Sequence, residues 1–298
     1  MLWEKMLVIN LFFVLGFVLK KLRIFKEEDG SVVLKMAFYI FLPAILFQSI
    51  RKVDFTFTYL FYPVIMLVSQ LIMSFFAATF LKNKNMDEGH KKIIVGFFGA
   101  ANIGFLYPFY ISIFGEQNVW RLGLLDFGNS IFLYAIIYSY IVGAKKKKDM
   151  VKKIFLSPGI MALILSLIVN FFHIKIYAPI DTFISQLAGL TGFAMLFSLG
   201  IFFNFKMSEI KKSGKIVLAK EAVKLILLVL VYHLNIEYYT KAAIMLVIIA
   251  PAASSLLNFS LFANLDTKFA SKLISLSMVM AFIEIPIVMY FLQKLSGS

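Results

Sequence analysis

The chain contains no cysteine, and only 15% of its 298 residues are charged. The missing thiols exclude disulfides and thiolate metal sites. A soluble domain is about half apolar and about a quarter charged, whereas 61% of this chain is hydrophobic and its mean hydropathy is +0.89. One soluble core cannot bury so much apolar surface. The sequence therefore predicts an all-α, multi-pass membrane protein whose surface contacts lipid.

Catalytic motifs are also missing. The sequence has no HExxH, no phosphate loop and no GxSxG. Its histidines, His90, His173 and His233, lie in predicted loops or at predicted span ends, and no two of them are at metal-binding spacing. We therefore expect no enzyme activity, no metal site and no cofactor, apart from a possible coupling ion such as a proton or sodium.

The net charge of +14 raises the question of nucleic acid binding. However, the lysines fall in short clusters between apolar runs, as cytoplasmic loop charge does in membrane proteins. We therefore expect membrane lipids, and not nucleic acid, around this chain.

Ten runs of mostly apolar residues are each about long enough to cross a bilayer. These predicted spans, one to ten, are residues 2–19, 32–50, 57–81, 93–115, 122–144, 157–172, 182–205, 216–234, 239–264 and 269–292.

Positive charge predicts the orientation of these spans. The connections after the odd-numbered spans carry 20 lysines and arginines, whereas the termini and the other connections carry 7. Because the positive side faces the cytoplasm, we expect both termini outside a plasma or inner membrane. The basic segment 145–153 is then cytoplasmic.

The ten spans divide into two groups of five, residues 1–144 and 157–298, joined by the basic loop 145–156. If the two halves are repeats, an odd number of spans in each half gives them opposite orientations in the membrane. Spans four and nine occupy corresponding positions, and each contains both proline and asparagine. Broken helices at corresponding positions are typical of secondary transporters. The simpler alternative is two proline-kinked helices with satisfied polar groups.

The interruptions in spans four and nine predict a binding site. Non-helical backbone at membrane depth is tolerated where it is buried in protein or lines a cavity. Because proline suits a first helical position, we expect half-helices to begin at Pro108 and Pro251. Two helix N-termini that meet near the midplane attract an anion. The candidate substrate-binding residues are Asn102, Gly104, Pro108, Pro251, Ser254, Ser255 and Asn258.

Ionisable residues inside predicted spans are functional candidates. Lys35 is a candidate, although it could simply snorkel to the cytoplasmic surface. Asp126 is another, although it could instead serve in capping or packing. Glu284 is the strongest, as a proton carrier or cation ligand, unless it pairs with a lysine. The residues Lys220, Glu221 and Lys224 favour a charged group on a helix surface, because Glu221 and Lys224 are three apart.

Four segments resemble the auxin efflux carrier family, which includes plant auxin exporters and bacterial malate permease-like proteins. "FYIFLPAILFQSI" (38–50) resembles its second span, and "NIGFLYPFYISIFGEQ" (102–117) its fourth. "LLDFGNSIFLYAI" (124–136), which contains Asp126 and Asn129, resembles the fifth span, and residues 250–287 resemble the ninth and tenth. Their order and spacing extend the resemblance over nearly the whole chain.

The resemblance implies ten spans in two inverted repeats, with spans four and nine crossing at a central site. It also implies a homodimer, organic anion substrates of the auxin or malate type, and supporting roles for Asp126 and Asn129. The chain differs from the family pattern at Leu106 and Tyr107, where a glycine is usual before the proline. It differs again at Glu284, where a small hydroxyl residue is common.

Together these features predict a secondary active transporter that moves a small organic anion by alternating access. The alternatives are a sodium- or proton-coupled transporter of a different small solute and a channel. A channel would need a continuous polar pore lining, and few charged residues fall inside the predicted spans.

Overall fold

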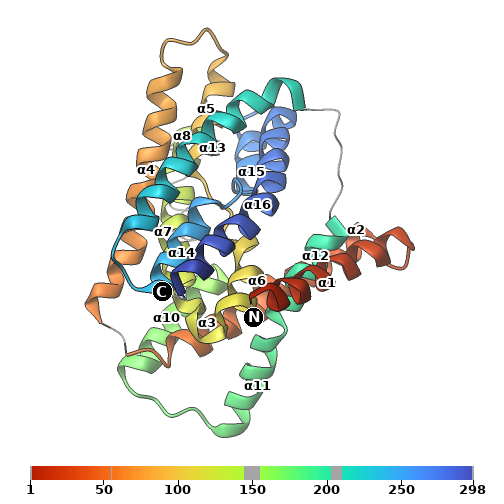
Figure 1. Ribbon diagram of the computed structural model, residues 1–298, viewed down its shortest axis with the longest axis vertical. Coiled ribbons are helices and arrows are strands. Elements are labelled where there is room, and N and C mark those ends of the chain that lie inside the picture. The colour runs from red at the N-terminus through yellow and green to blue at the C-terminus, as the bar shows by residue number, and fades with distance from the viewer. Residues whose placement is uncertain (1, 55, 144–154, 203–209, 297–298) are drawn as a thin grey trace. The chain divides into compact units, whose positions relative to one another are not determined.

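The computed structural model describes residues 2–54, 56–143, 155–202 and 210–296 (Figure 1). The predicted basic segment 145–153 lies outside the described residues. The helices are α1 (Leu2–Lys21), α2 (Glu27–Met36), α3 (Leu42–Ile50), α4 (Phe61–Leu81), α5 (Glu88–Gly99), α6 (Ile103–Phe114), α7 (Val119–Ile131), α8 (Tyr138–Val142), α10 (Pro158–Phe171), α11 (Ala178–Gly189), α12 (Thr191–Phe202), α13 (Ile210–His233), α14 (Tyr238–Ile248), α15 (Ser255–Phe262) and α16 (Thr267–Ser296).

Short π-helical and 3₁₀ turns continue several of these helices. The π-helical turn η1 (Ala37–Phe41) joins α2 to α3, and η4 (Phe132–Ile137) joins α7 to α8. The 3₁₀ turns η2 (Phe57–Leu60) and η3 (Glu116–Asn118) precede α4 and α7. As a result, several continuous helical segments consist of two helices joined by such a turn.

Among the described residues, five helical segments are long and apolar enough to cross a membrane. They are Glu27–Ile50, Phe57–Leu81, Glu116–Val142, Ala178–Phe202 and Thr267–Leu295. Ile103–Phe114, Pro158–Phe171 and Tyr238–Ile248 are apolar but shorter. The prediction of an all-α membrane protein is confirmed.

The chain forms two compact units that do not coincide with its N- and C-terminal halves. The first unit comprises Met1–Tyr59, Tyr107–Leu124 and Phe155–Phe205. The second comprises Leu60–Leu106, Leu125–Ile154 and Lys206–Ser298. Each unit therefore combines segments from both halves of the sequence.

In the first unit, α1 packs against α12 at very short range (Figure 1). A Cβ atom added to Gly16 would lie 2.2 Å from the Phe197 carbonyl oxygen, and one added to Gly200 would lie 2.0 Å from that of Phe13. Small residues let membrane helices approach to backbone contact, where packing replaces the hydrophobic effect as the source of attraction. These two glycines are therefore required by the close approach.

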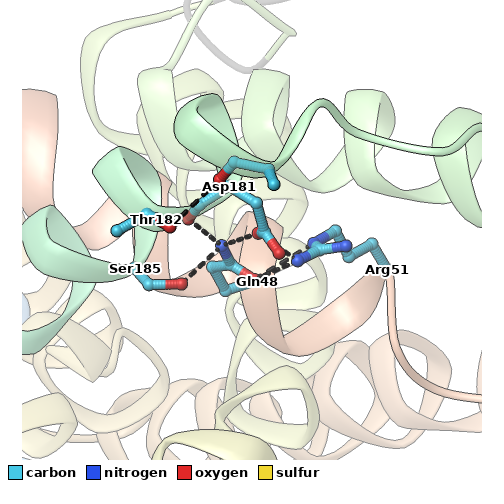
Figure 2. A network of polar contacts seen from close by, with 6 residues as sticks. Gln48, Arg51, Asp181, Thr182 and Ser185 are labelled. Atoms are coloured by element: carbon cyan, nitrogen blue, oxygen red, sulfur yellow. Dashed lines mark hydrogen bonds and ion pairs between the residues drawn. The ribbon is translucent and has the colours of Figure 1, made fainter.

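Polar side chains hold α3 to its neighbours in the same unit (Figure 2). Gln48, which is 6% exposed, donates through Nε2 to Asp181 Oδ1 at 2.6 Å and to Ser185 Oγ at 2.9 Å. Arg51 pairs with Asp181 and donates to Gln48 Oε1 at 2.7 Å. From α10, Asn170 Nδ2 donates to the Arg51 and Val53 carbonyls at 3.0 and 2.6 Å. Two carbonyls just beyond the end of α3 thereby gain a donor.

In the second unit, α5 lies among α4, α8, α15 and α16. Buried Phe97, Phe132, Phe259 and Leu273 belong to the core of this unit. The starts of two of its helices are capped by acidic side chains. Asp87 accepts the His90 N–H at 3.0 Å and Glu237 accepts the Thr240 N–H at 2.8 Å, which fixes where α5 and α14 begin.

Candidate functional site

Two helical runs are interrupted within the second unit, and the interruptions lie against each other. α5 ends at Gly99 and α6 begins at Ile103, whereas α14 ends at Ile248 and α15 begins at Ser255. The Asn102 N–H donates to the Pro251 carbonyl at 2.8 Å, and the Ala253 N–H donates to the Ala100 carbonyl at 3.1 Å. Ala101 and Ala252 form an antiparallel bridge. Backbone groups that left a helix therefore satisfy one another.

The prediction that helices resume at Pro108 and Pro251 is wrong. Pro108 lies inside α6, and Pro251 lies in the extended segment before α15. α6 begins earlier because Asn102 Oδ1 accepts the Phe105 N–H at 3.3 Å and so caps the helix. The φ angle of proline suits extended backbone as well as a first helical turn. A proline can thus indicate a nearby break without fixing where the helix restarts.

The structure brings Asn102 and Ser254 together at these breaks. Asn102 Nδ2 lies 3.4 Å from Ser254 Oγ, a long hydrogen bond. Asn102 is half-buried, whereas Ser254 and Asn258, one turn further along, are exposed. The Ser255 hydroxyl oxygen is buried and has no hydrogen-bond partner among the described residues. Gly104 is the second residue of α6. Polar groups with spare capacity therefore gather where α6 and α15 begin.

Ser277 supports this arrangement and was not predicted from the sequence. Its Oγ accepts the Ala252 N–H at 3.0 Å and donates to the Ile274 carbonyl at 2.8 Å, and the side chain is fully buried. The only available signal was a serine in an apolar run. Such a serine usually bonds to its own helix, so the sequence did not distinguish Ser277 from the other serines of the spans.

Asp126 and Asn129 belong to a second polar group in the same unit. Asn129 is 3% exposed, accepts from Gln70 Nε2 at 2.7 Å and donates to Asp126 Oδ1 at 3.1 Å. Gln70, on α4, was not predicted. Its Oε1 atom is buried and has no hydrogen-bond partner among the described residues. The Gln70 amide thus connects α4 to Asn129 and, through it, to Asp126 in the fifth predicted span.

Glu284 lies in a buried charged group with residues of α13. Lys224 Nζ lies 3.2 Å from Glu284 Oε2 and 2.9 Å from Glu221 Oε2. The alternative that Glu284 pairs with a lysine is therefore what the structure shows. The prediction of a surface group on α13 is wrong, because Lys220 and Lys224 are only 3% and 1% exposed. Helix spacing predicted the pairing of Glu221 with Lys224, but α13 is packed against α14 and α16 and buries the group.

Lys35 is exposed in the last turn of α2, in the first unit. Pro108 also belongs to the first unit, whereas the other candidate residues belong to the second. The candidate site is therefore described from the second unit alone.

Comparison with known proteins agrees with a transport role. The family model described as "Membrane transport protein" matches residues 1–152. An uncharacterized transporter of Methanothermobacter thermautotrophicus is 24% identical over 208 residues, covering 68% of each chain. An uncharacterized transporter of Methanocaldococcus jannaschii is 28% identical over 211 residues, covering 66% of this chain and 68% of that one. The chain belongs to the membrane transport protein family, which is the auxin efflux carrier family that its motifs resemble.

Proposed function

We propose that this protein is a secondary active carrier that moves a small organic anion across the membrane by alternating access. The observation that carries the proposal is the pairing of two interrupted helical runs, Ala100–Asn102 against Pro251–Ala253, beside Asn102 and Ser254. Irregular backbone at membrane depth is costly unless it serves a site. Discontinuous helices are where carriers commonly bind their substrates.

The pattern of helix packing supports two inverted five-span repeats. In the first unit α1 packs on α12, and α3 packs on α10. In terms of the proposed spans, these are contacts of span one with seven and of span two with six. Exchanging the halves of the chain replaces span one by span six and span two by span seven. The contact of span one with seven then becomes the contact of span six with two. A repeat related by an internal two-fold axis produces this result.

The second unit has the same property. Exchanging the halves converts the packing of α4 on α5 into that of α13 on α14, and the packing of α4 on η4 into that of α13 on α16. It also converts the contact of α8 with α15 into that of α16 with α5. All six pairings are present. The antiparallel bridge of Ala101 with Ala252 suits a two-fold axis passing between them.

An anionic substrate fits the ends of α6 and α15. Both helices begin at the paired segments, and a helix N-terminus carries a partial positive charge. The Asn102 amide, the Ser254 and Ser255 hydroxyls and the Asn258 amide can donate to a carboxylate. The substrate class we propose is therefore a small carboxylate of the auxin or malate type, held by amides, hydroxyls and backbone N–H groups. In this proposal Gly104, Pro108 and Pro251 shape the site.

The remaining features of the proposal follow from loop charge and from the family. Both termini lie outside the cell and the basic loop lies inside. The connections after the odd-numbered spans carry 20 lysines and arginines, whereas the termini and the other connections carry 7. The working form is a homodimer, as in the family. Lys35, Asp126, Asn129 and Glu284 are its candidate coupling or supporting residues, with a proton or sodium as the possible coupling ion.

Uptake into proteoliposomes tests the proposal. Purified protein is reconstituted and offered radiolabelled monocarboxylates and dicarboxylates, with protein-free vesicles and a heat-denatured sample as controls. We expect saturable uptake of at least one carboxylate, inhibited by unlabelled analogues and reduced in Asn258→Ala. Asn10→Ala, a change in α1 of the other unit, is the matched control. Unsaturable flux at channel rates, or normal carboxylate uptake by Asn258→Ala together with Asn102→Ala, would contradict the proposal.

A further inference from the structure

Lys220 is a buried lysine whose side chain donates to the main chain of another helix. It lies near the middle of α13 and is 3% exposed. Its Nζ atom donates to the Phe97 carbonyl at 2.7 Å and lies 4.5 Å from the centroid of the Phe97 ring. A buried ammonium is costly without such partners. The contact therefore calls for an explanation beyond packing.

The carbonyl that Lys220 binds is at the C-terminal end of α5. The last carbonyls of a helix have no intrahelical donor and carry partial negative charge. Here the Gly96 carbonyl accepts the Ala100 N–H at 2.8 Å, and the Ala100 carbonyl accepts the Ala253 N–H at 3.1 Å. The ordinary helical donor for Phe97, the N–H of Ala101, lies past the end of α5. Lys220 takes its place.

Such an end is the kind of position that binds sodium in carriers. C-terminal ends of half-helices and unwound carbonyls coordinate sodium or protons in secondary transporters. In this chain the Lys220 side chain already donates to the Phe97 carbonyl. Because Lys220 is part of the chain, its presence at this carbonyl does not depend on the sodium concentration in solution.

The charges around Lys220 balance without a free ion. The charged side chains that act on it are Lys224 and Glu221 of α13 and Glu284 of α16. The charged residues of α5 lie in its first two turns, well before Phe97. The one charged residue of α14, Lys241, donates instead to the Tyr232 carbonyl at 3.0 Å. The group therefore contains two lysines and two carboxylates, of which Lys224 pairs with both Glu221 and Glu284, and it is neutral when all four are ionised.

We propose that Lys220 is a built-in cation that occupies, at the end of α5, the position a coupling sodium ion would take. Substrate binding and uptake consequently need no sodium ion at this position. That consequence rests on the proposed carrier function. The occupancy itself does not, because it can be tested on the purified protein with sodium as the only probe.

The test compares Lys220→Ala with Lys220→Met by thermal unfolding. Each purified protein is measured in sodium chloride and in choline chloride at equal ionic strength. Alanine removes the ammonium, frees the Phe97 carbonyl and leaves the carboxylates in excess by one charge. Methionine removes the same charge but fills the space with an apolar chain. Ligand binding to the folded state raises the unfolding midpoint by mass action.

We expect the midpoints of wild type and Lys220→Met to be the same in the two salts. We expect sodium to raise the midpoint of Lys220→Ala by about 3 °C once its concentration is about ten times the dissociation constant. A saturable sodium-dependent rise in wild type would overturn the proposal, as would a Lys220→Ala variant that does not respond to sodium.

A direct measurement covers the case in which Lys220→Ala does not fold. Binding of ²²Na⁺ to the wild-type protein is then measured by equilibrium dialysis, with and without excess unlabelled sodium. Absence of displaceable ²²Na⁺ supports a site already filled by Lys220, and displaceable binding contradicts it. Absence of carboxylate uptake by the wild-type protein, by contrast, would contradict the carrier proposal. It would not affect the conclusion that Lys220 occupies the sodium position.

Discussion

Asn102 caps α6 and is proposed to contact the substrate, and substitution can separate the two roles. Its Oδ1 caps α6 by accepting the Phe105 N–H, and its Nδ2 makes a long 3.4 Å hydrogen bond to Ser254 Oγ. Asn102→Asp keeps a good capping oxygen but loses the donor and adds a negative charge. We therefore expect Asn102→Asp to lower carboxylate affinity by more than tenfold while the unfolding midpoint changes little. Isothermal titration and thermal unfolding measure the two quantities.

Asn102→Ala is the comparison variant, because it loses both roles. Loss of a hydrogen bond to a charged ligand costs about 1–3 kcal/mol, which is about ten- to a hundred-fold in affinity. Its unfolding midpoint should also fall, by the loss of a helix cap worth about 1 kcal/mol. Wild-type affinity in both variants would remove Asn102 from the binding site.

Glu284 is the residue whose substitution tests proton coupling. It is one of two carboxylates around Lys224, and it lies 3.2 Å from the ammonium. Glu284→Gln keeps the shape of the side chain but cannot exchange a proton, so we expect the pH dependence of uptake to flatten. Uptake is measured between about pH 5 and pH 8, the range in which most proteins keep their stability.

The control for this variant is Glu221→Gln. It removes the other carboxylate that faces Lys224, at 2.9 Å, and belongs to α13 instead of α16. If Glu284 alone carries the proton, Glu221→Gln lowers uptake without flattening its pH profile. A folded Glu284→Gln variant with the wild-type profile would leave Glu284 as a structural partner of Lys224.

At this scale the sequence predicted the residues that stand out by type. Asparagine, serine and a carboxylate inside apolar runs are unusual, so Asn102, Ser254 and Glu284 were identified as candidates. Gln70, Ser277 and Lys220 were missed as participants, because their roles come from contacts with residues far away in the sequence. Lys220 donates to a carbonyl on α5 and Ser277 accepts from a backbone N–H between α14 and α15. No local pattern contains such information.

At the scale of elements, a hydrogen bond to Ser277 connects the break in the ninth predicted span to α16. Its hydroxyl is the acceptor for the buried Ala252 N–H. Ser277→Ala leaves that N–H unsatisfied, which costs about 1–3 kcal/mol. Ser260→Ala is the matched control, since Ser260 is equally buried but its hydroxyl donates to the Leu256 carbonyl of its own helix at 2.8 Å.

We expect thermal unfolding of Ser277→Ala to begin several degrees below wild type, and that of Ser260→Ala close to it. Equal midpoints in the two serine variants would mean that Ala252 finds another acceptor. The break would then be held by its own antiparallel pairing.

The start of α16 supplies a prediction about acid stability. Asp266 accepts the Phe269 N–H at 2.9 Å and lies 3.2 Å from His90 Nε2. These partners, the backbone N–H first, hold the pKa of the Asp266 carboxyl below its usual range. A carboxyl with a lowered folded-state pKa stabilises the protein above its unfolded pKa of about 3.9, and this contribution is lost as the pH falls further.

We therefore expect Asp266→Asn to lower the unfolding midpoint at neutral pH by a modest amount, because the carboxylate is about half exposed. The difference from wild type should disappear as the pH drops below about 4. Repeating both measurements in a His90→Gln background separates the helix cap from the histidine pair. A difference that persists unchanged in acid would show that the charge of Asp266 contributes nothing.

The elements themselves could largely be predicted, because each apolar run corresponds to a helix or to two helices in sequence. Predicting where a run is interrupted was less successful. Pro108 and Pro251 indicated that the fourth and ninth runs are irregular, yet the helices restart at Ile103 and Ser255. Capping by Asn102 and pairing between distant backbone segments decide those positions, and both depend on the tertiary structure.

At the scale of the whole molecule, the compact units combine segments from both halves of the chain. The sequence suggested a division at residues 145–156, because composition shows only where charge interrupts apolar runs. Packing follows a different division, in which corresponding spans of the two proposed repeats enter the same unit. The proposed repeat could be tested only through contacts between helices that are far apart in the sequence, and such contacts exist only in the folded chain.

The orientation of the two proposed repeats gives the last prediction. Asn83, between α4 and α5, and Asn235, between α13 and α14, are both exposed and lie at corresponding places in the two halves. If the repeats are inverted, these two residues face opposite sides of the membrane. The loop charge puts Asn83 inside, because Lys82 and Lys84 flank it. Since the chain has no cysteine, Asn83→Cys and Asn235→Cys each introduce a single thiol.

We expect an impermeant maleimide added to intact cells to label Asn235→Cys at least about tenfold faster than Asn83→Cys, with both labelled equally after the membrane is permeabilised. The expectation follows from the bilayer, which excludes a charged reagent from the cytoplasmic side. Thr56→Cys, exposed between α3 and α4, is a second outside position that checks the assignment. Labelling of Asn83→Cys and Asn235→Cys from the same side would contradict the inverted repeat. Labelling of Asn83→Cys alone would keep the repeat but reverse its orientation, because the two residues would still face opposite sides.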